Sequence, residues 1–254
     1  MKNPNVILIT GASSGIGAAL ADAYAERGVK LLLMGRDMPR LMDIEKLCRA
    51  KGAAVKLAAM DVTDSAAMRN QILQWFDQEP IDLVIANAGI SGGGLIRNAD
   101  HQSRFEDVVT VNVNGTLNTV LPLISRMQQR GKGQIALMSS LAGFRGLPTA
   151  AAYSTSKVAV AALGQALRPV LARDGIAVNV IHPGFIATPL TAVNGFFMPF
   201  LMQPARAAQK IRAGLEDNKA RICFPWPMAF MARLIAWLPN AWVDGLLSRA
   251  PRKD

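Results

Sequence analysis

Tyr153 and Lys157 stand four residues apart in the stretch Ala151-Ala-Tyr-Ser-Thr-Ser-Lys157. Side chains at this spacing share one face of a helix. A phenol with an ordinary pKa of about 10 transfers protons poorly near neutral pH, but a neighbouring cation in a desolvated site can lower that pKa. The pair is therefore a candidate proton-transfer site, although the same spacing also fits an ordinary half-exposed helix face.

The composition excludes several kinds of site. The chain has 254 residues, of which 51% are hydrophobic and 18% charged, enough to bury the core of one α/β domain or two small ones. Its two cysteines, Cys48 and Cys223, are far apart in sequence and predict neither a disulfide framework nor a metal cage. The chain has only two histidines, His101 and His182, which makes a Ser-His-Asp triad improbable. We expect His182 to be structural.

The ends and the charge predict a cytoplasmic protein. A strand-like run begins within six residues of Met1, which leaves no space for a cleavable signal peptide. No apolar window approaches the roughly 20 residues of a membrane span. The net charge of +10 suits an anionic partner, yet the basic residues are scattered and form no recognisable nucleic-acid-binding module. Solubility, or attraction to anionic cofactors and membrane surfaces, explains this charge more simply.

Short apolar runs alternate with helical stretches along most of the chain. We expect seven strands, at residues 6–10, 29–34, 54–59, 81–85, 133–138, 176–181 and 221–224. This alternation is typical of a parallel sheet covered by helices on both faces. Neither a linker nor an internal repeat interrupts it, so one domain over residues 1–254 is expected. The long helical region 103–130 should break locally at Val111-Asn-Val-Asn-Gly115, because Asn and Gly are poor helix formers.

A glycine turn follows the first expected strand. The segment Gly11-Ala-Ser-Ser-Gly15-Ile-Gly17 leads into an alanine-rich helical stretch. A strand, a glycine turn and a helix allow backbone amides and the helix N-terminus to face a pyrophosphate. The turn is not a P-loop, and its spacing differs from Gly-x-Gly-x-x-Gly. It could also serve only to pack the helix on the strand.

Residues about 20 positions beyond that turn usually distinguish NAD from NADP. A carboxylate there binds the ribose 2′-hydroxyl of NAD, whereas an arginine accommodates the 2′-phosphate of NADP. Gly35 and Arg36 favour NADP, while Asp37, close before Pro39, is expected to cap a helix instead. Asp61, at the end of the third strand, could meet the adenine ring. Helix capping by Asp61 or Asp64 is an equally open alternative.

Three further polar groups follow expected strands. They are Asn87-Ala-Gly89, Ser139-Ser140, and Pro183-Gly184 with Thr188 beyond it. The carboxyl ends of parallel strands meet at one edge of the sheet, where open α/β sheets bind ligands. These groups should therefore lie together.

In this order, the motifs resemble the short-chain dehydrogenase/reductase family in its single-domain branch. The matching features cover roughly residues 5–190 and are Thr10-Gly-x-x-x-Gly-x-Gly17, Asn87-Ala-Gly89, Asn112, Ser140, Tyr153-x-x-x-Lys157 and Pro183-Gly184. Ser140 is chosen over Ser139 because it precedes Tyr153 by 13 positions, as is common in this family. The resemblance implies a Rossmann-like, doubly wound parallel sheet of about seven strands.

The resemblance also assigns roles. Tyr153 would donate or accept the proton, Ser140 would hydrogen-bond the substrate oxygen, and Lys157 would bind the nicotinamide ribose and lower the pKa of Tyr153. Asn112 would hold a water in a proton relay, and no metal is required. Besides Tyr153 and Lys157, the residues implied to line the cofactor are Gly11, Ser13, Gly15, Ile16, Gly17, Arg36, Asp61, Val62, Asn87 and Thr188.

Two departures from the family pattern bear on the cofactor. Ala86 stands where many members have a second asparagine, which should be tolerated because the turn depends on Asn87 and Gly89. Ser14 occupies the place where some NADP-preferring members carry a basic residue. The expected preference for NADP(H) thus depends on Arg36 alone, and NAD(H) is possible.

The C-terminal part departs most. The Val-Asp-Gly-Gly signature of many reductases is absent, and an extension of about residues 225–254 follows the last strand. Phe230, Leu234, Trp237 and Leu238 fall at helical spacing. Their apolar face could pack on this or a partner subunit, close a substrate pocket, or rest on a membrane surface. The expected substrate lid, about residues 189–203, is also apolar, which predicts a hydrophobic or amphipathic carbonyl or alcohol substrate.

Alternative functions predict different features. A nucleotide-binding scaffold without turnover could use the same fold, although the complete set of catalytic residue types argues against it. A nucleotide-sugar epimerase should have another glycine spacing and a larger C-terminal domain. The family resemblance further implies a homodimer or homotetramer formed through the helices that contain Asn112 and Tyr153.

Overall fold

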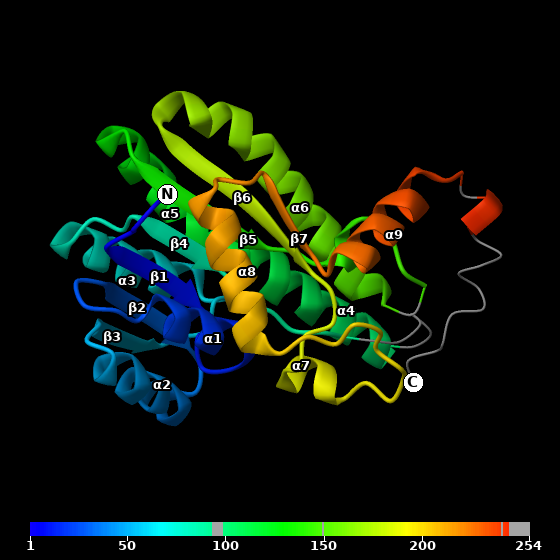
Figure 1. Ribbon diagram of the computed structural model, residues 1–254, viewed down its shortest axis with the longest axis horizontal. Coiled ribbons are helices and arrows are strands. Elements are labelled where there is room, and N and C mark those ends of the chain that lie inside the picture. Colours follow the sequence, from blue (N-terminus) through cyan, green and yellow to red (C-terminus); the bar gives the residue numbers. More distant parts are fainter. Residues whose placement is uncertain (93–98, 149, 240, 244–254) are drawn as a thin grey trace.

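Seven parallel strands form a single sheet at the centre of the molecule (Figure 1). The computed structural model describes residues 1–92, 99–148, 150–239 and 241–243. The sheet order is β3-β2-β1-β4-β5-β6-β7. The strands are β1 (Val6–Thr10), β2 (Lys30–Gly35), β3 (Ala54–Ala59), β4 (Leu83–Ala86), β5 (Gly133–Met138), β6 (Ile176–Pro183) and β7 (Arg221–Phe224). The parallel sheet expected from the alternating pattern is confirmed.

The central strands are apolar on both faces, which is why helices cover both sides. In β1, Ile7 and Ile9 belong to one buried cluster, whereas Val6 and Leu8 belong to another on the opposite face. Successive side chains of a strand point to opposite faces, so alternate residues of β1 pack into different helical layers. Burial on both faces also explains why β1 is a continuous apolar run instead of an alternating one.

Two helical layers enclose the sheet. Residues of α1, α2 and α8 complete the first buried cluster, and residues of α3, α5 and α6 complete the second. The helices are α1 (Gly15–Tyr24), α2 (Met38–Ala50), α3 (Ser65–Gln78), α4 (Ala99–Val109), α5 (Gly115–Arg130), α6 (Ala151–Leu171), α7 (Pro189–Ala192), α8 (Pro204–Glu216) and α9 (Trp226–Trp237). The doubly wound, Rossmann-like fold is confirmed.

The topology creates a crevice beside β1. The chain first builds outward from β1 through β2 to β3, and then continues on the other side of β1 with β4. Ligands of open α/β sheets bind where the direction of winding reverses, outside the carboxyl ends of the strands. The segments that follow β1, β4, β5 and β6 all begin at this carboxyl edge of the sheet.

Several element boundaries differ from the sequence prediction. The first helix ends at Tyr24 instead of about Gly28, and β4 begins at Leu83 instead of Ile81. Asp82, the residue just before β4, has a side chain with a separate role. Its carboxylate accepts hydrogen bonds from the backbone amides of Asn5 and Val6. The other predicted strands lie within two residues of the observed bounds.

The long helical region does break where Asn112 lies. A π-helical turn, η1 (Thr110–Asn114), joins α4 to α5. In the C-terminal extension, the expected helix is present as α9. Residue 240 and residues 244–254, including the predicted apolar Leu246 and Leu247, lie outside the described part.

Candidate active site

The glycine turn brings the start of α1 close to the ends of β1 and β4. Gly11 and Gly15 adopt φ values of +65° and +56°, the left-handed region that favours glycine. A Cβ on Gly17 would lie 2.6 Å from the Asn87 side-chain nitrogen. Ser14 precedes α1 without capping it through its side chain. The turn therefore has the geometry of a pyrophosphate cradle at a helix N-terminus.

Asn87 holds this turn to the end of β4. Its side-chain nitrogen donates to the carbonyl oxygens of Thr10 and Gly11, over 3.0 and 3.2 Å. The Thr10 hydroxyl in turn accepts hydrogen bonds from the backbone amides of Asn87 and Ala88. Thr10 was part of the sequence motif, but its role became clear only from these contacts.

One end of the pocket contains Arg36 and Asp61. Their side chains form an ion pair with an Nη1–Oδ2 distance of 3.6 Å. The other Asp61 oxygen accepts bonds from the Thr63 amide and hydroxyl, over 2.9 and 2.8 Å. The Thr63 amide, followed by its hydroxyl and Arg36, lowers the pKa of Asp61 against the opposing effect of burial. Asp61 and Val62 both line the pocket.

Two aspartates near this end have the capping roles proposed for them. Asp37 accepts a hydrogen bond from the Arg40 amide at the start of α2, over 3.0 Å. Asp64 does the same for α3 through the Ala67 amide. The capping prediction for Asp37 is confirmed, and of the two alternatives for the α3 cap the structure has Asp64.

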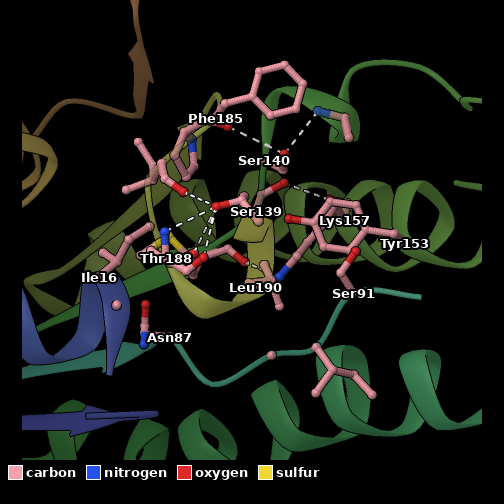
Figure 2. A pocket seen from close by; sticks show the side chains of 18 of the residues that line it. Ile16, Asn87, Ser91, Ser139, Ser140, Tyr153, Lys157, Phe185, Thr188 and Leu190 are labelled. Atoms are coloured by element: carbon pink, nitrogen blue, oxygen red, sulfur yellow. Dashed lines mark hydrogen bonds between the residues drawn. The ribbon is translucent and has the colours of Figure 1, made fainter. Parts of the chain in front are cut away.

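Ser140, Tyr153 and Lys157 line the same pocket, as Figure 2 shows. Ser140 follows β5, while Tyr153 and Lys157 come from the first two turns of α6. Burial raises the pKa of Tyr153 above its ordinary value, and a hydrogen bond with Ser140 opposes that rise. The phenol is thus protonated near neutral pH and bonded to the serine that the sequence paired with it.

Lys157 differs from the sequence prediction in one respect. Its Nζ donates to the carbonyl oxygen of Met138 over 3.0 Å and lies 5.5 Å from the centre of the Tyr153 ring. Burial lowers the pKa of Lys157 to about 8. The expected lowering of the Tyr153 pKa by Lys157 does not appear here, because desolvation of the phenol dominates.

Asn112 is buried, and its side chain is fully engaged. The Nδ2 atom donates to the Ile90 carbonyl over 3.0 Å and to the Ser156 hydroxyl over 2.9 Å, while Oδ1 accepts from the Ile90 amide over 2.8 Å. Gly89 gives this side chain room, since a Cβ there would lie 2.8 Å from Oδ1. A water held by Asn112 stays a prediction. Because the side chain is engaged, the backbone carbonyl of Asn112 is the group that would bind this water.

Further residues support Ser140, Tyr153 and Lys157 from behind. The Ser139 hydroxyl donates to the Lys157 carbonyl over 2.8 Å, and Ser156 donates to the Tyr153 carbonyl over 2.7 Å. His182 Nδ1 lies 2.9 Å from the Ser140 carbonyl, and burial lowers the pKa of this histidine to about 4. A neutral, buried His182 agrees with the structural role expected for it.

The other end of the pocket is apolar. The cavity has a volume of about 1060 Å³ and reaches from Arg36 to Ile235. Its far wall is built by the loop after β5, the segment after β6, the lid segment 189–203 and α9. The lining residues there are Phe144, Phe185, Leu190, Phe196, Phe200, Met228, Met231 and Ile235. Arg145 Nη1 donates to the Ile235 and Leu238 carbonyls over 2.8 and 3.0 Å. This side chain fastens the end of α9 to the loop between β5 and α6.

Comparison with known proteins places these residues in a family context. A sequence model described as short chain dehydrogenase matches residues 5–195. An uncharacterized oxidoreductase of Myxococcus xanthus is 37% identical over 95% of this chain and 96% of its own length. A short-chain dehydrogenase from Sphingobium yanoikuyae, solved in complex with NADPH, has a TM-score of 0.80 at 27% identity, covering 98% of this chain and 97% of that one. One from Mycobacterium paratuberculosis bound to NAD has a TM-score of 0.75 at 27% identity, covering 85% and 94%.

Proposed function

Because the chain belongs to the short-chain dehydrogenase/reductase family, we propose that it is an NADP(H)-dependent oxidoreductase interconverting a ketone or aldehyde and its alcohol. One observation carries the proposal. The Ser140 hydroxyl, which lowers the pKa of Tyr153, lies with that phenol at the wall of a cavity that also contains the glycine turn and Lys157. That cavity joins a place for a dinucleotide to a pair of hydroxyl donors for a substrate oxygen.

The residues present fit a nicotinamide dinucleotide. The turn at Gly11, Gly15 and Gly17 has no space for side chains, so its backbone can approach a pyrophosphate closely. The residues proposed to hold the cofactor are Gly11, Ser13, Gly15, Ile16, Gly17, Arg36, Asp61, Val62, Asn87, Tyr153, Lys157 and Thr188, of which all but Gly17 line the cavity directly. When bound, the dinucleotide supplies the hydride acceptor or donor that no amino-acid side chain provides.

Tyr153 handles the proton. Its raised pKa keeps the phenol protonated near pH 7, so in reduction it gives its proton to the carbonyl oxygen. Ser140 donates a hydrogen bond to the same oxygen and steadies the negative charge that develops there. Lys157, still charged below its pKa of about 8, offsets the charge left on the Tyr153 oxygen. In alcohol oxidation the same groups act in reverse.

Arg36 is the basis for the preference for NADP(H). It lines the cavity with a side chain that is 70% exposed, and its weak ion pair with Asp61 leaves guanidinium donors available to a 2′-phosphate. Asp37, the competing carboxylate, is committed to capping α2. A carboxylate free to bind the 2′-hydroxyl of NAD is therefore lacking at that position.

The apolar end of the cavity favours a bulky, uncharged substrate. The carboxylates among the described lining residues are Asp37 and Asp61, both at the end that contains Arg36. Near Ser140 and Tyr153 the cationic side chains are Lys157 and Arg145, and both are bonded to backbone carbonyls. An amine substrate would leave its charge without a partner there, whereas aromatic or long aliphatic ketones and alcohols would bury apolar surface.

The decisive experiment compares wild type with Tyr153→Phe and Ser140→Ala. NADPH consumption is followed with a panel of apolar ketones and aldehydes, and dinucleotide binding is measured separately by calorimetry. We expect Tyr153→Phe to lose about 10²- to 10⁴-fold in kcat while NADPH still binds. Full turnover by Tyr153→Phe would overturn the proposed chemistry. Tight NADPH binding by wild type without consumption across the panel would favour a scaffold role instead.

We also propose a homodimer or homotetramer formed through α4, α5 and α6. Leu121 on α5 and Val170 on α6 are more than half exposed in the single chain, although both are apolar. Large aliphatic side chains on neighbouring helices are suited to a subunit contact. Sedimentation equilibrium of wild type and of Leu121→Glu should show an oligomer that the variant weakens, whereas a monomeric wild type would refute the assembly.

A further inference from the structure

Exposed apolar side chains lie on the two segments, the lid and α9, that also line the apolar end of the cavity. They belong to the outer face of α9, with Trp226, Phe230, Leu234 and Trp237, and to the tip of the lid, with Phe197, Phe200 and Leu201. Phe197 is 87% and Trp237 is 90% exposed, which is unusual for side chains of this size. We call these seven residues the rim face. In Figure 1, α9 and the segment after α7 lie at the same end of the molecule.

The rim face is continuous with the apolar end of the cavity. Phe200 and the exposed Met231 of α9 both line the cavity, beside the rim residues Phe197 and Phe230. The opposite, inner side of α9 supplies Met228 and Ile235 to the cavity wall. The helix is thus apolar on both sides, one towards the cavity and one towards the exterior.

The sequence of the two rim segments is unusually poor in charge. Residues 184–203 contain no charged residue, and residues 225–243 contain only Arg233. The same two segments hold eight of the fifteen aromatic residues of the chain, including three of the four tryptophans. Tryptophan is enriched where a surface meets the boundary between lipid and water. The lack of carboxylates removes the charges that an anionic surface would repel.

We propose that the rim face docks on an anionic lipid surface, with the mouth of the cavity turned towards the bilayer. The net charge of +10 attracts such a surface, and the apolar side chains then bury themselves at the headgroup boundary. A second protein subunit on the rim face would cover the mouth, whereas a bilayer leaves it open to an apolar substrate dissolved among the acyl chains. In the described part of the chain, no helix has the length and hydropathy of a membrane span.

The experiment is co-sedimentation of the full chain with vesicles. One set contains phosphatidylglycerol and phosphatidylcholine, and the other contains phosphatidylcholine alone. The triple variant Phe197→Ser, Phe230→Ser and Trp237→Ser removes apolar surface outside the cavity lining. The control, Met42→Ser and Leu47→Ser, removes two apolar side chains of α2 that are about half exposed. None of the five substitutions touches a residue proposed for the cofactor or for catalysis.

Wild type and the α2 control should bind the anionic vesicles at least tenfold more strongly than the triple variant, and less strongly at high salt. Turnover of a water-soluble ketone should be equal in all three proteins, which separates this inference from the proposed function. Wild type that stays in the supernatant with both vesicle types would overturn the proposal. So would a triple variant that binds vesicles normally but loses an oligomer, because a second copy would then cover the rim face.

Discussion

The Asn112 side-chain amide donates to the Ser156 hydroxyl over 2.9 Å, which joins the π-helical turn to the helix that carries Tyr153 and Lys157. Asn112 is wholly buried, as is Ser156. The same amide side chain pairs with both backbone groups of Ile90. One asparagine therefore fixes three segments that meet at the proposed catalytic residues.

These hydrogen bonds predict that removing Asn112 destabilises the protein more than removing the Ser156 hydroxyl. Ser156→Ala removes the hydrogen bond from Asn112 and the one to the Tyr153 carbonyl, and should lower the free energy of unfolding by about 1 to 2 kcal/mol. Asn112→Ala also leaves both backbone groups of Ile90 unpaired and should cost about 3 kcal/mol. Urea denaturation measures both, with exposed Thr155→Ala on the same helix as the control. If Asn112→Ala were no less stable than Ser156→Ala, the Ile90 contacts would not matter.

The buried Lys157 predicts a pH dependence for carbonyl reduction. Its pKa of about 8 means that the ammonium is charged at pH 6 to 7 and neutral above about pH 9. Because the charge offsets the phenolate formed on Tyr153, kcat/KM for reduction should fall as pH rises through 8, while alcohol oxidation, which needs the phenolate, should rise with pH. Rate profiles between pH 6 and 10 measure this effect. In Lys157→Met the fall near pH 8 should disappear, and a flat wild-type profile would contradict the assignment.

The Arg36 assignment predicts a change in cofactor choice. Arg36→Ala should weaken NADPH binding at least tenfold more than NADH binding, because only NADPH carries the 2′-phosphate. The lost ion pair with Asp61 is exposed, so the folding stability should hardly change. Calorimetric titration of both dinucleotides tests this, with Arg69→Ala on the exposed surface of α3 as the control. Equal losses for the two dinucleotides would refute the preference.

The close packing of the glycine turn predicts that adding one methyl group at Gly17 lowers both the stability of the protein and its affinity for the dinucleotide. A Cβ there would clash with the Gly11 carbonyl oxygen and with Asn87, which are backbone and a bonded side chain that cannot move aside. Gly17→Ala should destabilise the protein by more than about 2 kcal/mol and weaken NADPH binding at least a hundredfold. Gly146→Ala is the control, since nothing lies within 4 Å of its Cβ position. Similar behaviour of the two variants would show that the turn can adapt.

The sequence predicted what local patterns encode. Strands such as β1 are continuous apolar runs because both faces are covered, and the glycines are required by the backbone itself. Asn112 could be expected to interrupt a helix, because its poor propensity acts locally. The type of interruption, a π-helical turn, depends instead on contacts with Ile90 and Ser156, which are distant in sequence.

Other parts of the site could not be predicted, because they depend on distances between segments. Lys157 donates to the Met138 carbonyl, a backbone group that no residue type signals. Arg145 fastens α9 through carbonyls about 90 residues away in the chain. Helical spacing in α9 predicted an apolar face, but the sequence left open whether that face packs inward. In the structure, one side lines the cavity and the other is exposed.

His182 predicts a specific sensitivity to acid. The histidine is 2% exposed, and its pKa is about 4 in the folded protein against about 6.5 in an unfolded chain. Between these values the unfolded state binds a proton that the folded state does not, so stability falls as pH drops from 6.5 to 4. The shift corresponds to about 3 kcal/mol. His182→Asn can keep a donor near the Ser140 carbonyl while removing this titration.

Denaturation of both proteins at pH 7 and pH 4 measures the effect. The free energy of unfolding of His182→Asn should fall by about 3 kcal/mol less over this range than that of wild type. Acidic groups such as Asp82, whose pKa is lowered in the folded state, contribute equally to both proteins and cancel in the comparison. If His182→Asn lost as much stability as wild type, the buried histidine would have to accept its proton in the folded state, next to the carbonyl of the serine proposed to bind the substrate.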